Sequence, residues 1–350
     1  MSKKIVHVVG TGTIGEPLVG LLTHFQKELG LDEVTFHKHS ISDRPKVKAL
    51  KGRGAKLVVD AEKMEGFKAA GMSAAMNHEQ ALKQASVIID CSPKGIEMKE
   101  KIYQHYEHNT LGFIAQGSEF GFGKMYARGI NDEVITAHDQ YIQVVSCNTH
   151  NLSCLLETLA LSGGNDNLVE GTFVCMRRAN DISQVKDFCP GPQVGAHKEG
   201  RFGTHHARDA YHLFQTKGLE LNLFSSAVKL NTQYMHSLWF DLRLKRPTTL
   251  EALKTKIKGN DRIAITEKMD ANTVFSFGRD QGHFGRILNQ TVIPLKTLTM
   301  PTKNRVVGFC FTPQDGNSLL SSLAAALRFT HPKDWETRIQ VLKPFFFDEV

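Results

Sequence analysis

The stretch that decides the fold is Lys4-Ile-Val-His-Val-Val9 followed by Gly10-Thr-Gly-Thr-Ile-Gly15, close to the start of this 350-residue chain. Its first half is largely apolar and β-branched, which predicts a buried strand. From residue 14 to residue 25 apolar side chains recur at helical spacing, which predicts an amphipathic helix. A G-x-G-x-x-G pattern between a strand and a helix is typical of dinucleotide-binding units. Gly10, Gly12 and Gly15 therefore predict a coenzyme pyrophosphate at the helix N-terminus.

Further βα units follow this motif. Apolar runs predict strands at residues 33–37, 55–60, 86–90 and 112–115, and residues 79–85 predict a short helix. Strands that alternate with helices predict a parallel, doubly wound sheet of the Rossmann type. The loops after two of these strands, at Ser92 and Gly117, lie where the nicotinamide half of a coenzyme is expected. The sequence thus predicts an α/β dinucleotide-binding domain over residues 1–146.

The end of the second strand bears on the choice of coenzyme. An NAD-binding fold usually places a carboxylate there, whereas this chain has His37-Lys-His-Ser40, followed by a basic loop with Arg44, Lys46 and Lys48. Cationic side chains suit a 2′-phosphate, so NADP is predicted over NAD, with Lys38 as a contact. A solvated basic loop is the alternative interpretation.

The pattern of the sequence changes in the second half of the chain. Strands are predicted at residues 168–178, 219–230, 235–244, 262–266, 291–299 and 305–311, with only one obvious helix between them, at 250–258. This pattern predicts an α+β domain built on a mostly antiparallel sheet, which we expect to be the catalytic and oligomerisation domain, residues 147–314. A last helix near 318–329 belongs to a C-terminal segment, about 315–350, that is expected to pack back on the first domain.

A single cysteine stands where a predicted strand gives way to a predicted helix. Residues 141–145 are strand-like, residues 152–161 have a helical pattern, and Cys147 falls between them, at the first helical turn. Unpaired N–H groups and the helix dipole favour a thiolate at such a position, so Cys147 is a candidate nucleophile. A buried structural cysteine is the alternative interpretation, and Cys154 is the second candidate nucleophile.

Composition argues against several classes of protein. No apolar stretch is long enough for a membrane span, and the start lacks the apolar core of a signal peptide. The six cysteines have no paired spacing, which argues against disulfides or a zinc ribbon and fits a reducing cytosol. The net charge of +7 comes from basic residues interspersed with acids. A nucleic-acid partner is therefore not favoured, and anionic small substrates fit equally well.

Three polar features stand out in the second half. Arg177 and Arg178 end a predicted strand. His205 and His206 fall in a predicted loop and offer donors for a phosphate or carbonyl oxygen. His236 opens another strand, where a hydrogen-bonded, half-buried histidine is the simpler interpretation. No carboxylate or cysteine stands at ligand spacing from the histidine pair, so no metal site is predicted.

Together these pieces resemble the archaeal-type (type II) phosphorylating glyceraldehyde-3-phosphate dehydrogenases, from residue 6 to about residue 328. Eight motifs in family order carry the resemblance: Gly10-Thr-Gly-Thr-Ile-Gly15, Ile89-Asp-Cys-Ser-Pro-Lys-Gly95, Gln116-Gly-Ser-Glu119, Val145-Ser-Cys-Asn-Thr149, Met176-Arg-Arg-Ala-Asn-Asp181, Thr204-His-His206, Met235-His236 and Gln314-Asp315. The chain departs from the family at Lys94, Ser118, Gly203-Thr204 and His150-Asn151. The last departure, beside the cysteine, bears on the size of the substrate pocket.

The resemblance implies oxidation of D-glyceraldehyde 3-phosphate and inorganic phosphate to 1,3-bisphosphoglycerate, a step of glycolysis, with NADP or NAD, by a cytoplasmic homotetramer. It assigns Cys147 as the nucleophile and His236 as the base. The expected substrate contacts are Ser146, Asn148, Thr149, His205 and His206. The expected coenzyme contacts are Thr13, Ile14, Gly117, Arg178 and Gln314, in addition to Gly10, Gly12, Gly15, Lys38 and Ser92.

Two other interpretations stay open. An acyl-phosphate reductase acting on aspartyl phosphate or N-acetylglutamyl phosphate would use the same thioester chemistry and would need an arginine for the substrate carboxylate. A non-catalytic NADP-binding or RNA-binding protein is suggested by the pI near 9.0. Such a protein would show an unreactive Cys147 and a salt-dependent affinity for RNA.

Overall fold

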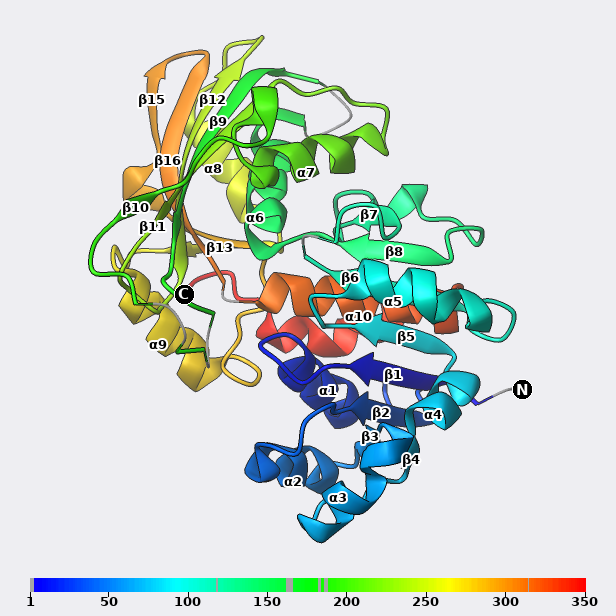
Figure 1. Cartoon of the computed structure of the whole chain (residues 1–350). Coiled ribbons are helices and arrows are strands. Elements are labelled where there is room, and N and C mark those ends of the chain that lie inside the picture. The colour runs from blue at the N-terminus through cyan, green and yellow to red at the C-terminus, as the bar shows by residue number, and fades with distance from the viewer. Residues whose placement is uncertain (1–2, 118, 162–165, 182–183, 186–187, 314) are drawn as a thin grey trace. The chain divides into compact units, whose positions relative to one another are not determined.

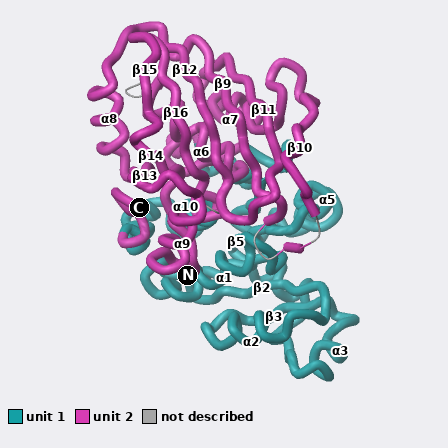
Figure 2. Tube along the Cα trace, turned by 90° about the vertical axis from the view of Figure 1, so that its left-hand side faces the viewer, with its two compact units in different colours: residues 1–124, 135–144, 319–343 teal, residues 125–134, 145–318, 344–350 magenta. Residues whose placement is uncertain are grey.

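The computed structural model describes residues 3–117, 119–161, 166–181, 184–185, 188–313 and 315–350 (Figure 1). The chain forms two compact units, each made of discontinuous segments (Figure 2). Unit 1 comprises residues 1–124, 135–144 and 319–343, and unit 2 comprises residues 125–134, 145–318 and 344–350. Within the described residues, none of the helices has the length and apolar character needed to cross a membrane.

Unit 1 is built on an eight-stranded sheet of order β4-β3-β2-β1-β5-β6-β8-β7. Its strands are β1 (Ile5–Val9), β2 (Glu33–His37), β3 (Lys56–Val59), β4 (Met76–Asn77), β5 (Val87–Asp90), β6 (Gly112–Gln116), β7 (Lys124–Tyr126) and β8 (Tyr141–Val144). Of the edge strand β7, Lys124 belongs to unit 1 and the other two residues to unit 2. In this spatial order, each neighbouring pair of strands from β4 through β1 to β8 is parallel. The central strand β1 is buried along its whole length, as its apolar sequence requires. The predicted parallel sheet is confirmed.

The helices that connect strands of this sheet are α1 (Gly15–His24), α2 (Arg44–Gly52), α3 (Met64–Ala69), α4 (His78–Gln84) and α5 (Gly95–Lys101). Two more, α10 (Gly316–Thr330), which begins in unit 2, and α11 (Trp335–Ile339), come after the last strand of the chain. The predicted basic loop at residues 44–48 is wrong, because these residues form α2. Asp43 caps that helix by accepting from the Lys46 N–H, and Pro45 stands in its first turn. Helix α10 contacts β6, where Gln116 donates to Ser322 Oγ at 2.7 Å.

Unit 2 contains a second eight-stranded sheet of order β10-β11-β9-β12-β16-β14-β13, with β15 paired to β16. Its strands are β9 (Leu168–Arg177), β10 (Gln193–Val194), β11 (Leu223–Lys229), β12 (His236–Leu244), β13 (Ile263–Thr266), β14 (Thr291–Pro294), β15 (Thr299–Thr302) and β16 (Arg305–Thr312). Two pairs, β9 with β11 and β13 with β14, are parallel, and the others are antiparallel. The predicted, mostly antiparallel sheet is confirmed, although the strand expected at 291–299 is divided between β14 and β15.

Four helices accompany the second sheet: α6 (Cys147–Leu156), α7 (His205–Gln215), α8 (Leu250–Lys258) and α9 (Ala271–Gln281). The sequence predicted only α8 between the strands, so the expectation of a single helix is wrong. His205 and His206 begin α7 rather than lying in a loop. Side chains of α6 and α7 join those of the sheet in one apolar core. That core fixes the first turns of both helices, where the candidate catalytic and substrate-binding residues lie.

Candidate active site

Unit 1 contains a pocket of about 600 Å³ at the carboxyl ends of its central strands. Four of the residues predicted to contact a coenzyme line it: Gly10, Gly12, Lys38 and Ser92. The remaining lining comes mainly from the loop after β1, the end of β2, Asp60 after β3, His78 at the start of α4, and the residues around Lys94. Carboxyl ends of parallel strands are where doubly wound folds bind ligands.

The loop at Gly10 has the shape that a bound pyrophosphate requires. Gly10 adopts a φ of +88°, which side chains other than glycine rarely tolerate. A Cβ on Gly15 would lie 2.0 Å from the Gly10 carbonyl oxygen, so only glycine lets α1 pack this closely on the loop. Gly12 has open space on its side-chain face, with nothing within 4 Å. The residues present therefore fit a dinucleotide.

The end of β2 carries an interacting group of cations and one acid. Lys38 is largely buried, and its Nζ donates to Ser42 Oγ at 3.4 Å. His37 Nε2 lies 2.9 Å from Asp60 Oδ1, and Lys63 Nζ lies 2.8 Å from Asp60 Oδ2. Burial by itself would raise the pKa of Asp60, but the contacts with Lys63 and His37 outweigh it and lower the pKa to about 2. Asp60 ends the strand predicted over residues 55–60, but its position at this pocket, next to His37, was not predicted.

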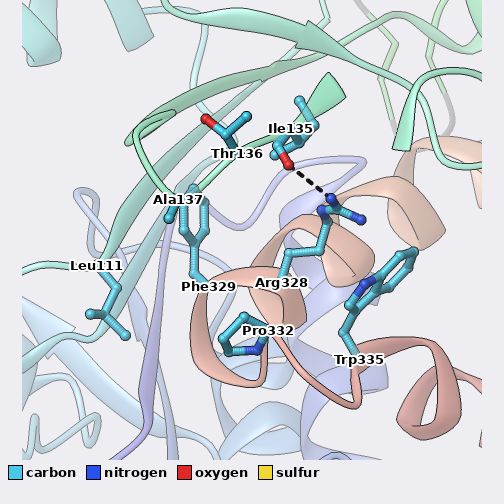
Figure 3. A pocket seen from close by; sticks show the side chains of 8 residues that line it. All are labelled: Leu111, Ile135, Thr136, Ala137, Arg328, Phe329, Pro332 and Trp335. Atoms are coloured by element: carbon cyan, nitrogen blue, oxygen red, sulfur yellow. Dashed lines mark hydrogen bonds between the residues drawn. The ribbon is translucent and has the colours of Figure 1, made fainter. Parts of the chain in front are cut away.

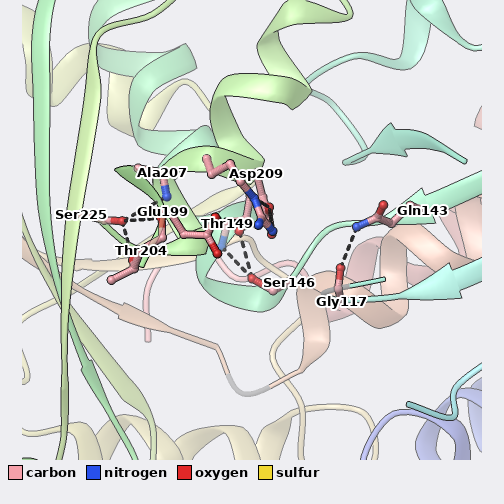
Figure 4. A network of polar contacts seen from close by, with 10 residues as sticks. Gly117, Gln143, Ser146, Thr149, Glu199, Thr204, Ala207, Asp209 and Ser225 are labelled. Atoms are coloured by element: carbon pink, nitrogen blue, oxygen red, sulfur yellow. Dashed lines mark hydrogen bonds and ion pairs between the residues drawn. The ribbon is translucent and has the colours of Figure 1, made fainter. Parts of the chain in front are cut away.

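The other predicted coenzyme residues are placed differently. Thr13, Ile14 and Gly15 form the start of α1 and do not line the pocket. Gly117 follows β6; its N–H donates to the Val144 carbonyl, and its carbonyl accepts from Gln143 at 3.0 Å (Figure 4). Arg178 belongs to unit 2, and Gln314 lies outside the described residues.

A second pocket in unit 1, of about 320 Å³, lies between residues 135–137 and the end of α10 (Figure 3). Its charged residue, Arg328, donates to the Ile135 carbonyl at 3.0 Å and lies over the Trp335 ring. The residues drawn around it include no cysteine or histidine. This pocket offers no nucleophile or base.

In unit 2, Cys147 is the first residue of α6, as predicted. Ser146 caps the helix, since its Oγ accepts from the Thr149 N–H at 3.3 Å and lies 2.9 Å from Thr149 Oγ1 (Figure 4). Cys147 is partly exposed, whereas Cys154, one of the alternatives, is fully buried. The thiol is thus held at a helix N-terminus by a side-chain cap.

The electrostatic setting of Cys147 differs from the expected one. Desolvation raises the pKa of the thiol to about 12, and Asp315 adds to this, while Arg178 and the helix N-terminus act in the opposite direction. The expectation of a lowered thiol pKa is not met, so Cys147 is a thiol at neutral pH. A nucleophilic role would require the thiol to lose its proton as it attacks.

Polar side chains join α6 to β16. Thr312 Oγ1 donates to Asn148 Oδ1 at 2.9 Å and accepts from Asn151 Nδ2 at 2.8 Å. Asn317 Nδ2 donates to the Cys147 carbonyl at 3.0 Å. Thr312 is in turn the cross-strand partner of His236. This network brings the predicted residues Cys147, Asn148 and His236 into one region of unit 2.

His236 is held by the backbone of a neighbouring strand. Its Nδ1 accepts a hydrogen bond from the Arg178 N–H at 3.0 Å. Burial, followed by the charges of Arg178 and Arg177, lowers the pKa of His236 well below 6.5. The ring is therefore neutral, and its hydrogen is on Nε2, because Nδ1 is engaged as an acceptor.

Arg178 is a buried cation whose charge acts on Cys147. Its Nη2 lies 3.2 Å from Asp181 Oδ1 and 3.4 Å from Asp315 Oδ1, while Nε and Nη1 have no hydrogen-bond partner in the described structure. Desolvation alone would lower its pKa, but Asp315 and Cys147 raise it, so the guanidinium stays charged. Two free donors on a buried cation suit an oxygen of a bound ligand.

The histidine pair begins α7. Thr204 Oγ1 lies 2.6 Å from Ser225 Oγ, which also accepts from the Ala207 N–H, so β11 holds the start of the helix (Figure 4). His206 is buried, and neither ring nitrogen has a hydrogen-bond partner in the described structure. Burial lowers the pKa of His206 well below 6.5, and His205 and Arg177 add to this. The pair is thus neutral and available to a ligand.

His150, whose effect on the substrate pocket the sequence left open, is fully buried in the helix. Its Nδ1 donates to the Ser146 carbonyl at 3.0 Å. Burial lowers the pKa of His150 to about 4. The side chain therefore stabilises the first turn of α6 as a neutral group.

The comparison with known proteins agrees with the site described above. No family model matches the sequence. The chain is 28% identical over 307 residues to the glyceraldehyde-3-phosphate dehydrogenase of Sulfolobus acidocaldarius, covering 84% of this chain and 82% of that protein. It is 27% identical over 289 residues to glyceraldehyde-3-phosphate dehydrogenase 2 of Methanosarcina barkeri, covering 81% and 80%. It is 27% identical over 264 residues to the Pyrobaculum arsenaticum enzyme of the same name, covering 71% and 70%. These homologues confirm the resemblance that the motifs indicated.

Proposed function

We propose that this chain is a phosphorylating aldehyde dehydrogenase that oxidises D-glyceraldehyde 3-phosphate to 1,3-bisphosphoglycerate. The observation that carries the proposal is the position of Cys147, which begins α6 beside the charged Arg178 and in the same unit as His236. The names of the relatives that cover most of the chain support this substrate. We further propose a cytoplasmic homotetramer, on the resemblance alone.

The reaction begins with addition of the Cys147 sulfur to the aldehyde carbon. Because the resting thiol is protonated, its proton passes to solvent as the carbon–sulfur bond forms, and the aldehyde oxygen takes up a proton to give a neutral adduct. Arg178, a buried cation next to Cys147, stabilises the negative charge that develops at the sulfur. The product of this step is a thiohemiacetal on Cys147.

His236 is assigned to the oxygen of that adduct. Its resting tautomer carries hydrogen on Nε2, since Nδ1 accepts from the Arg178 N–H. Such a ring donates a hydrogen bond to the carbonyl oxygen and stabilises it as charge develops. The base role predicted from the sequence requires the opposite, a free lone pair on the ring. We therefore assign His236 first as a donor to this oxygen.

The later steps complete the cycle. The pocket of unit 1 would hold the nicotinamide coenzyme, which would supply the hydride acceptor. Loss of a hydride to that coenzyme and of the hydroxyl proton to solvent would convert the adduct on Cys147 into a thioester. Inorganic phosphate then attacks the thioester carbon, the carbon–sulfur bond breaks, and the acyl phosphate leaves. The Cys147 thiolate takes up a proton, which restores the resting thiol.

Phosphate binding is assigned to the group around the histidine pair. Arg177 acts electrostatically on both His205 and His206, and His206 has unused ring nitrogens. Arg208 is less suited, because it is already paired with Glu199 and Asp209. Charge-assisted contacts of this kind are the usual way to hold a phosphate.

NADP is proposed over NAD because Lys38 is the cation that lines the pocket at the end of β2. Asp60, the nearby acid, is already engaged by His37 and Lys63. A 2′-phosphate at this position therefore meets an available ammonium group rather than an unpaired carboxylate.

A panel of aldehydes, assayed by the absorbance of the reduced coenzyme, tests the proposed reaction. Turnover of glyceraldehyde 3-phosphate that requires phosphate or arsenate is the expected result. Oxidation without phosphate would indicate a hydrolytic aldehyde dehydrogenase. Activity only with aspartate semialdehyde would indicate the related acyl-phosphate reductase.

Cys147→Ser is the matched variant for this assay. It should bind coenzyme as the unchanged protein does, yet lose nearly all turnover, because a hydroxyl forms no thioester. Cys154→Ser, a buried cysteine on the same helix, is the control and should keep its activity. Activity in Cys147→Ser comparable to that of the control would refute the assignment.

A further inference from the structure

Unit 1 holds a cluster of metal-ligating side chains that the proposed reaction does not use. His37 ends β2, Asp60 follows β3, and His78 begins α4. Each offers one ligand atom, and the three atoms all lie within 4.8 Å of one another. Because the register of parallel strands places the ends of β2 and β3 side by side, three segments distant in sequence meet at this point.

The two imidazoles face the same carboxylate oxygen. His37 Nε2 lies 2.9 Å and His78 Nδ1 lies 3.8 Å from Asp60 Oδ1. The two rings are stacked, with centroids 4.0 Å apart and an angle of 23° between their planes. Both nitrogens therefore lie near the same carboxylate oxygen, and one of the stacked rings has to turn before both nitrogens can point at a single ion.

The ring nitrogens of His78 lack good hydrogen-bond partners. Its Nε2 is buried without a hydrogen-bond partner in the described structure, and its Nδ1 is too far from Asp60 for a good hydrogen bond. An imidazole nitrogen with no strong hydrogen bond of its own is open to a metal ion.

The surroundings hold these groups in place. The other oxygen of Asp60, Oδ2, lies 2.8 Å from Lys63 Nζ and 3.0 Å from His39 Nδ1. His7, fully buried in β1, lies with its ring centroid 5.5 Å from that of His78. Hydrogen bonds to the far oxygen of a ligating carboxylate are a common means of orienting it.

We propose that His37, Asp60 and His78 bind a divalent transition-metal ion of the zinc class. Two imidazole nitrogens with one carboxylate favour zinc or cobalt, whereas calcium and magnesium prefer all-oxygen sites. Bonds of about 2.0–2.2 Å to one ion require the three ligand atoms, now within 4.8 Å of one another, to draw together and one of the stacked rings to turn toward the ion. The fourth position faces the 600 Å³ pocket, which all three residues line, and is available to water or another ligand.

The test uses the full-length protein, freed of metal by a chelator, with zinc or cobalt alone as the probe. Calorimetry with zinc should give one saturable high-affinity site per chain. Cobalt should give the visible absorption of a nitrogen- and oxygen-ligated ion. Sulfur-to-cobalt absorption at the same stoichiometry would overturn the proposal, because it would place the ion on a cysteine.

Two ligand variants and one control decide the location. His78→Ala and Asp60→Asn should each weaken zinc binding by about tenfold or more. His108→Ala, which removes an exposed histidine elsewhere in unit 1, should leave the affinity unchanged.

Zinc should also raise the unfolding temperature of the unchanged protein but not that of His78→Ala, because the ion joins three segments. Equal affinities in His78→Ala, Asp60→Asn and His108→Ala, or no saturable binding at all, would refute the site. Coenzyme and substrate are absent from every measurement, so its outcome is independent of the proposed reaction.

Discussion

The Nδ1 atom of His236 accepts a hydrogen bond from the Arg178 backbone, and that contact determines what the ring can do. A backbone N–H can only donate, so the neutral ring must carry its own hydrogen on Nε2. The same strand pairing that holds Arg178 and His236 side by side thus selects a tautomer. His236 was predicted to act as a base, but in the resting protein its Nε2–H is a hydrogen-bond donor.

Two substitutions of His236 separate the roles. Glutamine keeps a donor near the Nε2 position but cannot act as a base, whereas alanine removes both functions. If the donor role dominates, His236→Ala should lower kcat by about 10²–10³-fold and His236→Gln by about tenfold. Equal losses in steady-state assays of the two variants would favour the base. Because burial holds the pKa of His236 well below 6.5, its protonation should cause no loss of rate between pH 8 and pH 6.

The proposed contact between Lys38 and NADP can also be tested with a single substitution. Removal of its ammonium group in Lys38→Ala should raise KM for NADP about tenfold, since one charge-assisted contact to the 2′-phosphate is lost. KM for NAD should barely change, because NAD has no phosphate there. Lys94→Ala, which removes a cation from another loop of the same pocket, is the control. An equal rise for both coenzymes in Lys38→Ala would contradict the assignment to NADP.

At the scale of secondary structure, the elements predicted from the sequence were those with a strong local signal. The G-x-G-x-x-G loop, the buried β1 and the helix beginning at Cys147 each depend on neighbouring residues, and each is present. Helix α7 was missed because its first turn, His205-His206, looks like a polar loop, although its buried face repeats at helical spacing in Ala207, Ala210 and Phe214.

The contacts that create the sites depend on pairing between distant segments, which one sequence does not reveal. Thr312 reaches Asn148 only because β16 lies beside α6 and pairs with β12. His37, Asp60 and His78 meet only through the order of the parallel strands. Burial and Asp315 raise the pKa of Cys147. The prediction of a lowered pKa considered only the helix N-terminus, and it was therefore wrong in direction.

Helix α7 carries a buried acid that makes stability depend on pH. Desolvation raises the pKa of Asp209 to about 6 despite its contact with Arg208, and its Oδ2 has no partner in the described structure. The unfolded carboxyl, with a pKa near 3.8, ionises first as pH rises. The folded state then binds more protons than the unfolded state, so the free energy of unfolding falls between about pH 4 and pH 6.

Asp209→Asn removes this titration. Relative to the unchanged protein, the variant should gain up to about 3 kcal/mol in free energy of unfolding on going from pH 4 to pH 7. Urea unfolding at several pH values measures the difference, and other titrating groups cancel because both proteins share them. A difference that stays constant with pH would show that Asp209 is ionised in the folded protein throughout.

At the scale of the whole molecule, neither unit is a continuous piece of chain. Unit 1 takes residues 319–343 from the far end of the sequence, and unit 2 takes residues 125–134 from within the first half. The sequence predicted a C-terminal segment packing on the first domain from the pattern of one helix. No periodicity in the sequence indicates that residues 125–134 belong to unit 2. Their assignment depends on which apolar core they pack into, and that is decided by residues distant in sequence.

The C-terminal segment should be essential to the dinucleotide-binding unit. Leu319, Leu320, Leu323 and Leu327 are almost fully buried. A Cβ on Gly112 would lie 2.2 Å from the Phe329 ring, so β6 and α10 are in close contact.

A fragment of residues 1–144 exposes the apolar surface that α10 covers. We expect this fragment to unfold without a cooperative transition and to bind a hydrophobic dye. The same fragment carrying residues 319–343 on a flexible linker should recover a cooperative transition, followed by circular dichroism during heating. If the shorter fragment melts as sharply and at the same temperature as the longer one, α10 contributes little to this unit.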